Sequence, residues 1–117
     1  MAEAPYMKPI IQQKLNLIKE SVLKTVPDTE SIYIFGSFVD GMPHKDSDID
    51  VCVVIPDSFP HNPVDVSIEI RKDLYKTLRM PMDLFVKKSA VFNSRKQAVT
   101  LEKVIMQDGV MIYGNGR

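Results

Sequence analysis

Three features of this chain combine residue types and spacings that could do chemistry. Asp48 and Asp50 stand two positions apart at the start of an apolar segment. The pair Gly36-Ser37 precedes them, with ten residues in between. Asp83 lies further along, inside the apolar segment PMDLFV. Neighbouring carboxylates are ligands for divalent cations, and a glycine-serine turn offers hydrogen-bond donors to phosphate.

The spacing of Asp48 and Asp50 suits a metal site. Residues two apart on a strand point to the same side, so the two carboxylates start about 6–7 Å apart. Two like charges at that distance repel by about 2–3 kcal/mol at an effective dielectric constant of 20. Mg²⁺ between them removes the repulsion, and it is commonly bound by one or two carboxylates together with substrate phosphates. The alternative is that Asp48 caps a turn and Asp50 faces solvent at a strand edge.

The Gly36-Ser37 pair directly follows a strand expected over residues 31–35. A turn at that point leaves backbone N–H groups and a hydroxyl free beyond the strand. A short helix starting there would favour phosphate at its N-terminus. The alternative is an ordinary turn glycine followed by an N-cap serine.

The third candidate, Asp83, shares one side of its expected strand with Phe85 and Lys87, by alternation. It could be a third metal ligand, or the base that takes a proton from an attacking hydroxyl. The alternative is an exposed edge position. The other carboxylates considered, Asp65, Glu69 and Asp73, are expected on the wet face of a helix.

Hydrophobic patterning predicts the elements that position these residues. Helices are expected over residues 8–25, 64–78 and 89–107, the last with a break near Asn93, and strands over residues 31–35, 48–55, 82–86 and 110–113. The predicted fold is therefore of the α/β (α+β) class, with a short mixed sheet of about four strands and helices mainly on one face.

The stretch GSFVDGMPHKDSDIDVCVV resembles the signature of the DNA polymerase beta-like nucleotidyltransferase superfamily, in which Gly-Ser, ten residues and Asp-x-Asp follow one another. The later MDLFV resembles the strand that carries the family's third carboxylate, here Asp83. The terminal DGVMIYG also resembles the end of the minimal members. The resemblance covers nearly the whole chain and implies the fold of that superfamily.

A chain of this size resembles the minimal nucleotidyltransferases (MNT), and the resemblance implies a mechanism. Asp48 and Asp50 would hold Mg²⁺, with Mn²⁺ as an alternative, against a nucleoside triphosphate, expected to be ATP. Gly36 and Ser37 would bind its β and γ phosphates. Asp83 would complete the metal site and help to activate an acceptor hydroxyl, which attacks the α-phosphate so that pyrophosphate leaves.

Minimal members often act beside a small helical HEPN-family toxin, as an antitoxin that modifies a tyrosine of the toxin. The resemblance therefore implies transfer of AMP to such a partner. Two alternatives stay open: a non-catalytic antitoxin or regulatory binding subunit, and an aminoglycoside-type transferase completed by an oligomer or a partner domain. Val39-Asp40 stands where many relatives carry an arginine, which mildly favours the binding subunit.

Length and composition limit the remaining possibilities. The chain has 117 residues and is expected to form one domain over residues 1–117, with residues 1–7 as a loose tail. Its net charge of zero and pI near 6.7 argue against nucleic acid as the main direct partner. Cys52, the single cysteine, excludes an intramolecular disulfide and is expected in the core. No apolar run is long enough for a membrane, so a cytoplasmic location is expected, and a homo-oligomer stays open.

Overall fold

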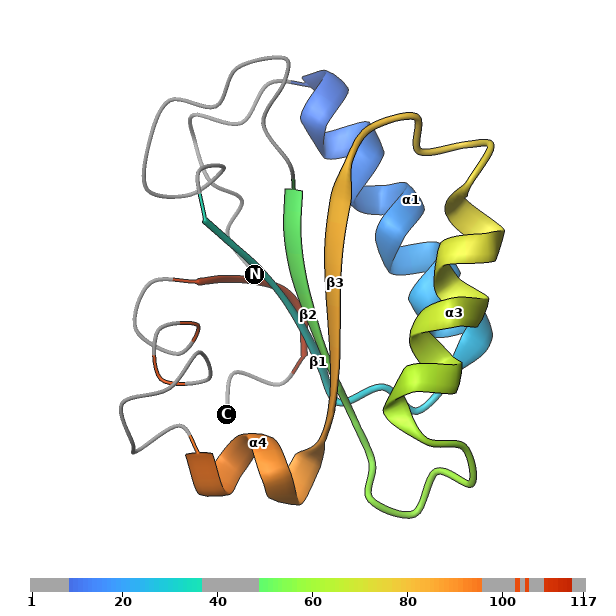
Figure 1. Cartoon of the computed structure of the whole chain (residues 1–117). Helices are drawn as coiled ribbons and strands as arrows, with labels where there is room; N and C mark the ends of the chain where they lie inside the picture. Colours follow the sequence, from blue (N-terminus) through green and yellow to red (C-terminus); the bar gives the residue numbers. More distant parts are fainter. Residues whose placement is uncertain (1–8, 37–48, 96–102, 104, 106–108, 115–117) are drawn as a thin grey trace.

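The computed structural model describes residues 9–36, 49–95, 103, 105 and 109–114, and in them the helices and strands follow the predicted order (Figure 1). The elements are α1 (Pro9–Thr25), β1 (Ser31–Phe35), β2 (Ile49–Ile55), α3 (Pro63–Leu74), β3 (Met82–Lys88), α4 (Ser89–Arg95) and β4 (Val110–Gly114). β1 has the predicted bounds because its five residues, SIYIF, are rich in β-branched and aromatic types.

The four strands form one mixed sheet in the order β3-β2-β1-β4. β1 lies in the middle and pairs antiparallel with both β2 and β4. β2 and β3 run parallel, and α3 makes the crossover between them. A parallel pair needs such a crossover, because a short hairpin can join only antiparallel strands.

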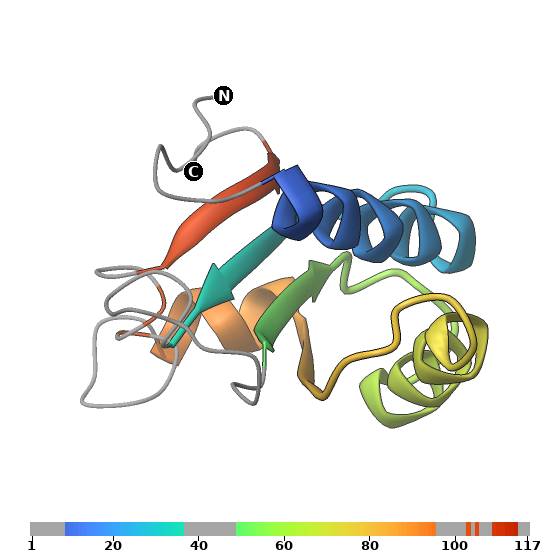
Figure 2. The same cartoon turned by 90° about the horizontal axis from the view of Figure 1, so that it is seen from above.

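One face of the sheet is covered by α1 and α3, which pack against each other (Figures 1 and 2). Each helix buries one apolar stripe against the alternate residues of the strands that point to this side. The main core consists of Leu15, Ile18, Val22, Val26, Ile32, Ile34, Ile49, Val51, Val53, Ile55, Val66, Ile70, Leu74, Leu78, Leu84, Val86 and Ile112.

The opposite face carries a smaller apolar cluster. Tyr33, Phe35, Cys52 and Val54 point to this side, and α4 adds Phe92. The rings of Tyr33 and Phe92 stack with centroids 5.6 Å apart. The prediction of helices mainly on one face is therefore confirmed, with α4 as the element on the other face (Figure 2). Cys52 is buried in this cluster, as expected.

Two boundaries differ by more than one residue from those expected. The helix predicted to end at Leu78 ends at Leu74, because hydrogen-bonded turns replace the regular pattern from Tyr75 onward. β3 continues past Val86 to Lys88, because parallel pairing with β2 extends to the partners Ile55 and Lys88. The helix expected over residues 89–107 is observed as α4 and at residues 103 and 105, and the rest of that range lies outside the described residues.

Candidate functional site

The end of β1 forms one wall of the candidate site. Phe35 is the last residue of β1 and pairs with Asp50 of β2. Gly36 follows with a φ of 81°, in the left-handed region that glycine adopts without steric cost. The chain therefore turns away from the sheet directly beside Asp50.

The side chain of Asp50 approaches the backbone of Gly36 very closely. A Cβ atom placed on Gly36 would lie 2.1 Å from Asp50 Oδ2 and 3.2 Å from Asp50 Cγ. The contact with Oδ2 is far too short and the one with Cγ is tight, so residue 36 must lack a side chain if this carboxylate is to stay where it is. Glycine at position 36 is therefore needed for the close approach of the Asp50 carboxylate as well as for the left-handed turn.

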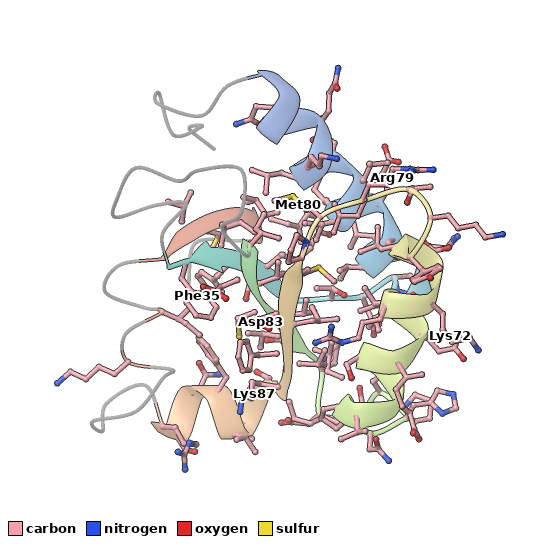
Figure 3. The ribbon with its side chains drawn as sticks, turned by 45° about the horizontal axis from the view of Figure 1, so that its top comes forward. Phe35, Lys72, Arg79, Met80, Asp83 and Lys87 are labelled. Carbon is pink, nitrogen blue, oxygen red and sulfur yellow. The ribbon has the colours of Figure 1, made fainter. Side chains whose placement is uncertain are left out.

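Asp83 lies beside Asp50 on the neighbouring strand. The two are register partners in the parallel β2–β3 ladder, which places their Cα atoms about 4.8 Å apart, the ordinary strand spacing. Both side chains point to the sheet face away from α1 and α3, since Val51 and Leu84 point into the main core. Figure 3 shows Asp83 and Phe35 on this side of the sheet and Lys72 on α3. Asp50 is half-buried and Asp83 is exposed.

Backbone and ring contacts fix the relative position of the strands at this end of the sheet. The N–H of Ile49 donates to the carbonyl of Pro81 over 3.0 Å, which extends the β2–β3 pairing by one bond just before Asp83. On the site's own face, the rings of Phe35 and Phe85 lie 5.9 Å apart, one residue before Gly36 and two after Asp83. These contacts hold the carboxylates on a rigid support.

Of the five residues expected to do chemistry, the structure places Gly36, Asp50 and Asp83 together. Ser37 and Asp48 lie outside the described residues. Two carboxylates on neighbouring strands repel each other unless a cation is shared between them. The oxygen donors present, with Asp48 two positions before Asp50, are of the type that Mg²⁺ prefers. Among the described residues alone, no three metal-ligating side chains come together.

The carboxylates expected on a helix are all on α3, on the far side of the sheet from this site. Asp65, Glu69 and Asp73 are exposed, as expected. Asp73 in addition pairs with Lys24 of α1, whose ammonium donates to Asp73 Oδ1 over 2.5 Å. This hydrogen bond holds the pKa of the Asp73 carboxyl below its ordinary value. Asp73 is thus a link between α1 and α3.

The nearness of Gly36 to Asp50 is the feature that the sequence pattern did not predict. The expectation for Gly36 concerned only backbone donors to phosphate. The sequence shows a glycine directly after a strand. That pattern alone does not reveal which side chain packs against the glycine.

A family model described as polymerase beta, nucleotidyltransferase, matches residues 16–117. The chain belongs to this nucleotidyltransferase family. The family resemblance inferred from the Gly-Ser and Asp-x-Asp spacing is therefore confirmed. No curated protein matches the chain in sequence.

Solved structures agree with this family in fold. A toxin–antitoxin complex determined with AMP-PNP superposes with a TM-score of 0.61 at 22% identity, over 86% of this chain and 73% of that one. The toxin–antitoxin MntA-HepT gives 0.57 at 19% identity, over 89% and 73%. A Sulfolobus solfataricus protein described as a candidate nucleotidyltransferase gives 0.56 at 22% identity, over 98% and 96%.

These comparisons and the sheet order together establish the nucleotidyltransferase fold, in which the described part of the chain contributes helices α1, α3 and α4 and a four-stranded mixed sheet. In the described part of this nucleotidyltransferase, no helix has both the length and the apolar character needed to cross a membrane.

Proposed function

We propose that this nucleotidyltransferase transfers AMP from ATP to a hydroxyl group of a partner protein, and that it acts in this way as an antitoxin. The acceptor is a tyrosine of a HEPN-type toxin. The site consists of Gly36 and Ser37 for the phosphates and of Asp48, Asp50 and Asp83 for Mg²⁺ and the acceptor. Ser37 and Asp48 enter the proposal through their sequence spacing alone.

One observation carries the proposal. Gly36 lies in the turn after β1, Asp50 on β2 and Asp83 on β3, yet they come together at the same end of the sheet. The turn after a strand brings backbone donors to a pair of carboxylates, and phosphoryl transfer needs phosphate donors and metal ligands at the same point. The family match indicates which class of reaction such a site would carry out, namely nucleotidyl transfer.

The carboxylates suit Mg²⁺ in number and kind, and Mn²⁺ accepts the same donors. Asp50 and Asp83 would bind it from adjacent strands, and Asp48 from the start of β2. When bound, the cation neutralises charge that develops on the phosphate oxygens and orients the triphosphate. Gly36 contributes a backbone free of a side chain, so that phosphate oxygens approach its N–H and the Ser37 hydroxyl.

The transfer itself forms one bond and breaks one. The acceptor oxygen attacks the α-phosphorus of ATP, and the bond between that phosphorus and the α–β bridging oxygen breaks in line. Pyrophosphate leaves with the electron pair of that bond. Asp83, exposed and adjacent to Asp50, takes the proton of the acceptor hydroxyl as general base. The products are an AMP ester of the acceptor and pyrophosphate.

The similar solved structures support a protein as the acceptor. Two of the similar structures are toxin–antitoxin complexes, and one of them was determined with AMP-PNP, an ATP analogue. The exposed position of Asp83 also suits a large acceptor, because a tyrosine on a protein surface can reach it without a deep pocket.

The test is incubation of the protein with Mg²⁺, ATP labelled at the α-phosphorus and the helical product of the neighbouring gene. Label is expected on a tyrosine of that product and is lost in the Asp48→Asn/Asp50→Asn double variant. Asp65→Asn is the matched control, since it removes a carboxylate from α3 on the other side of the sheet. Mass spectrometry identifies the modified residue.

Other outcomes separate the alternatives. If the double variant still binds and neutralises the toxin undiminished, catalysis is not required and the chain is a binding subunit. Label that appears on an aminoglycoside but never on a protein would favour a small-molecule transferase. Either result overturns the proposed acceptor, and a protein that does not bind ATP in the presence of Mg²⁺ overturns the proposal as a whole.

A further inference from the structure

The outward face of α3 carries a stripe of large apolar side chains that the described residues leave uncovered. Val64, Ile68 and Tyr75 are 67%, 48% and 82% exposed. Spacings of four and seven residues place them on one side of a helix. The buried residues of α3, Val66 and Ile70 among them, point the opposite way. The helix is therefore apolar on two sides, although only one of them faces the core.

This stripe continues past the last regular residue of α3. Tyr75 has a right-handed helical conformation, and its N–H donates to the carbonyl of Lys72. The N–H of Leu78 donates to the carbonyl of Leu74 over 3.0 Å, an α-type bond. Tyr75 and the following Lys76 thus belong to the same outward face as Ile68.

The charges along this face are separated by sign. Asp65 and Glu69 lie on one flank of the stripe in α3. Lys72 follows on the same flank near the end of the helix, and Lys76 follows in the turns just beyond it. The Lys72 ammonium and the Glu69 carboxylate lie 3.9 Å apart, with both side chains more than 60% exposed. An ion pair this exposed is weak, so both groups remain available to other partners.

We propose that α3 pairs antiparallel with α3 of a second copy of this chain, about a two-fold axis level with residue 70. In an isologous contact, if one residue meets a second, the second also meets the first. An axis at this level sets Val64 of one copy against Tyr75 of the other. On the flank, Asp65 faces Lys76 and Glu69 faces Lys72 across the axis. The separated charges thus become four attractive pairs, which a single copy cannot make.

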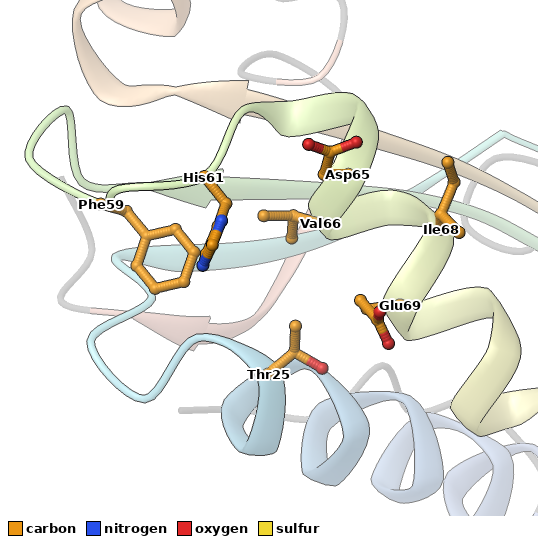
Figure 4. A pocket seen from close by; sticks show the side chains of 7 residues that line it. All are labelled: Thr25, Phe59, His61, Asp65, Val66, Ile68 and Glu69. Atoms are coloured by element: carbon orange, nitrogen blue, oxygen red, sulfur yellow. The ribbon is translucent and has the colours of Figure 1, made fainter.

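A cavity of about 470 Å³ lies at the same end of α3 as Val64 (Figure 4). Phe59 and Val66 line it with apolar surface, and His61 and Asp65 add polar groups. The antiparallel arrangement brings Tyr75 of the second copy to this end of the helix. Its ring would lie over Val64, next in the chain to the cavity residue Asp65, where its hydroxyl can donate to a carboxylate. The most exposed aromatic side chain described in the structure would in this way gain an apolar neighbour and a hydrogen-bond acceptor.

The proposed contact leaves the candidate active site open. α3 covers the sheet face opposite to the one from which Asp50 and Asp83 point. Two helices of this length bury less surface than the roughly 1,200 Å² of a standard stable interface, so the dimer is expected to be weak and dependent on concentration. It is independent of the proposed reaction, and its test needs neither ATP nor a toxin.

Sedimentation equilibrium of the full chain over a wide range of concentration tests the proposal. The wild-type protein is expected to pass from monomer to dimer. Ile68→Glu puts a carboxylate from each copy into the apolar contact, about 6 Å apart along the helices on either side of the axis, and is expected to weaken the dimer by at least about tenfold in Kd. Val91→Glu is the matched control, because Val91 is 46% exposed on α4, and it should dimerise like the wild type. Circular dichroism checks that every variant is folded.

Charge reversal gives a second, sharper test. The Lys72→Glu/Lys76→Glu variant has an all-acidic flank, and the Asp65→Lys/Glu69→Lys variant has an all-basic one. Each alone is expected to be monomeric at concentrations where the wild type is dimeric. Mixed in equal amounts they should form a heterodimer, which high salt dissociates.

The proposal is overturned by a wild-type chain that stays monomeric at all concentrations. It is equally overturned if Ile68→Glu dimerises as well as Val91→Glu, since another surface is then responsible. Failure of the two charge variants to associate on mixing, while the wild type dimerises, would exclude the antiparallel arrangement.

Discussion

The Asp50 carboxylate occupies the space that a side chain on Gly36 would need, with Oδ2 2.1 Å from the position of a Cβ atom there. In the sequence, 13 residues (37–49) separate Gly36 from Asp50, and Ser37 and Asp48 are among them. The close approach therefore holds the turn after β1 against the start of β2. A side chain at residue 36 would move the carboxylate, the backbone or both.

Gly36→Ala is expected to lower the free energy of unfolding by about 2 kcal/mol, from the left-handed φ and the collision with Asp50 together. In an Asp50→Ala background the cost should fall to about 1 kcal/mol, the backbone part alone. The remaining neighbour, the Cβ of residue 50, lies at an ordinary 3.6 Å. Urea denaturation of the four proteins measures the coupling, and equal costs in both backgrounds would contradict it.

Asp83→Asn is expected to stabilise the protein when no divalent cation is present. It removes one of two like charges on neighbouring strands, which is worth about 0.5 kcal/mol. With Mg²⁺ in hundredfold excess over its Kd, the wild type should gain about 2.7 kcal/mol. The variant should gain clearly less, because it lacks one ligand.

Thermal unfolding with and without Mg²⁺ measures both effects of Asp83→Asn. Asp65→Asn is the control, because it removes an exposed carboxylate on α3 and should leave the response to Mg²⁺ unchanged. A wild-type protein whose stability does not respond to Mg²⁺ would refute the assignment of this site.

Asn62→Ala is expected to lower the free energy of unfolding by about 1 kcal/mol. The Asn62 side chain accepts a hydrogen bond of 2.8 Å from the N–H of Asp65, and this N-cap starts α3 directly before Pro63. Asn62→Asp keeps an acceptor at the same place and should cost much less. Chemical denaturation ranks the three proteins, and an aspartate as damaging as alanine would show that the cap contributes little.

Helices and strands were predictable from the sequence where the residue types and the spacing of the apolar residues indicate the same structure. The strand Ser31–Phe35 has its expected bounds, and the stripe Leu15, Ile18 and Val22 faces the core from α1. α3 was harder because it has two apolar stripes. Ile68 and Leu74 both fit helical spacing, yet only Leu74 is buried. The choice between stripes depends on which side meets the sheet, and local pattern does not contain that information.

The residues of the candidate site were predictable from the sequence, but their arrangement in space was not. Alternation correctly placed Asp83 with Phe85 and opposite Leu84. The register that sets Asp83 beside Asp50 results from the crossover through α3, which fixes how far β3 slides along β2. Tertiary pairing of this kind is a long-range property, so the roles of these residues stay predictions that the variants above test.

The ion pair between Lys24 and Asp73 is expected to make stability depend on pH in acid. The Lys24 hydrogen bond lowers the pKa of Asp73 from its ordinary value of 3.8 in the folded protein, and the unfolded chain lacks this contact. The unfolded chain therefore binds more protons as the pH falls. The contribution is complete above the unfolded pKa and disappears as the pH falls through the folded one.

Asp73→Asn removes this contribution, so the variant should be less stable than the wild type at neutral pH. The difference should shrink as the pH falls below about 4. Urea denaturation at a series of pH values measures it. Glu69→Gln is the control, because the Glu69 carboxylate lies 3.9 Å from its partner Lys72 and both side chains are more than 60% exposed. A difference that stays constant down to strong acid would mean that packing, and not the charge of Asp73, connects α3 to α1.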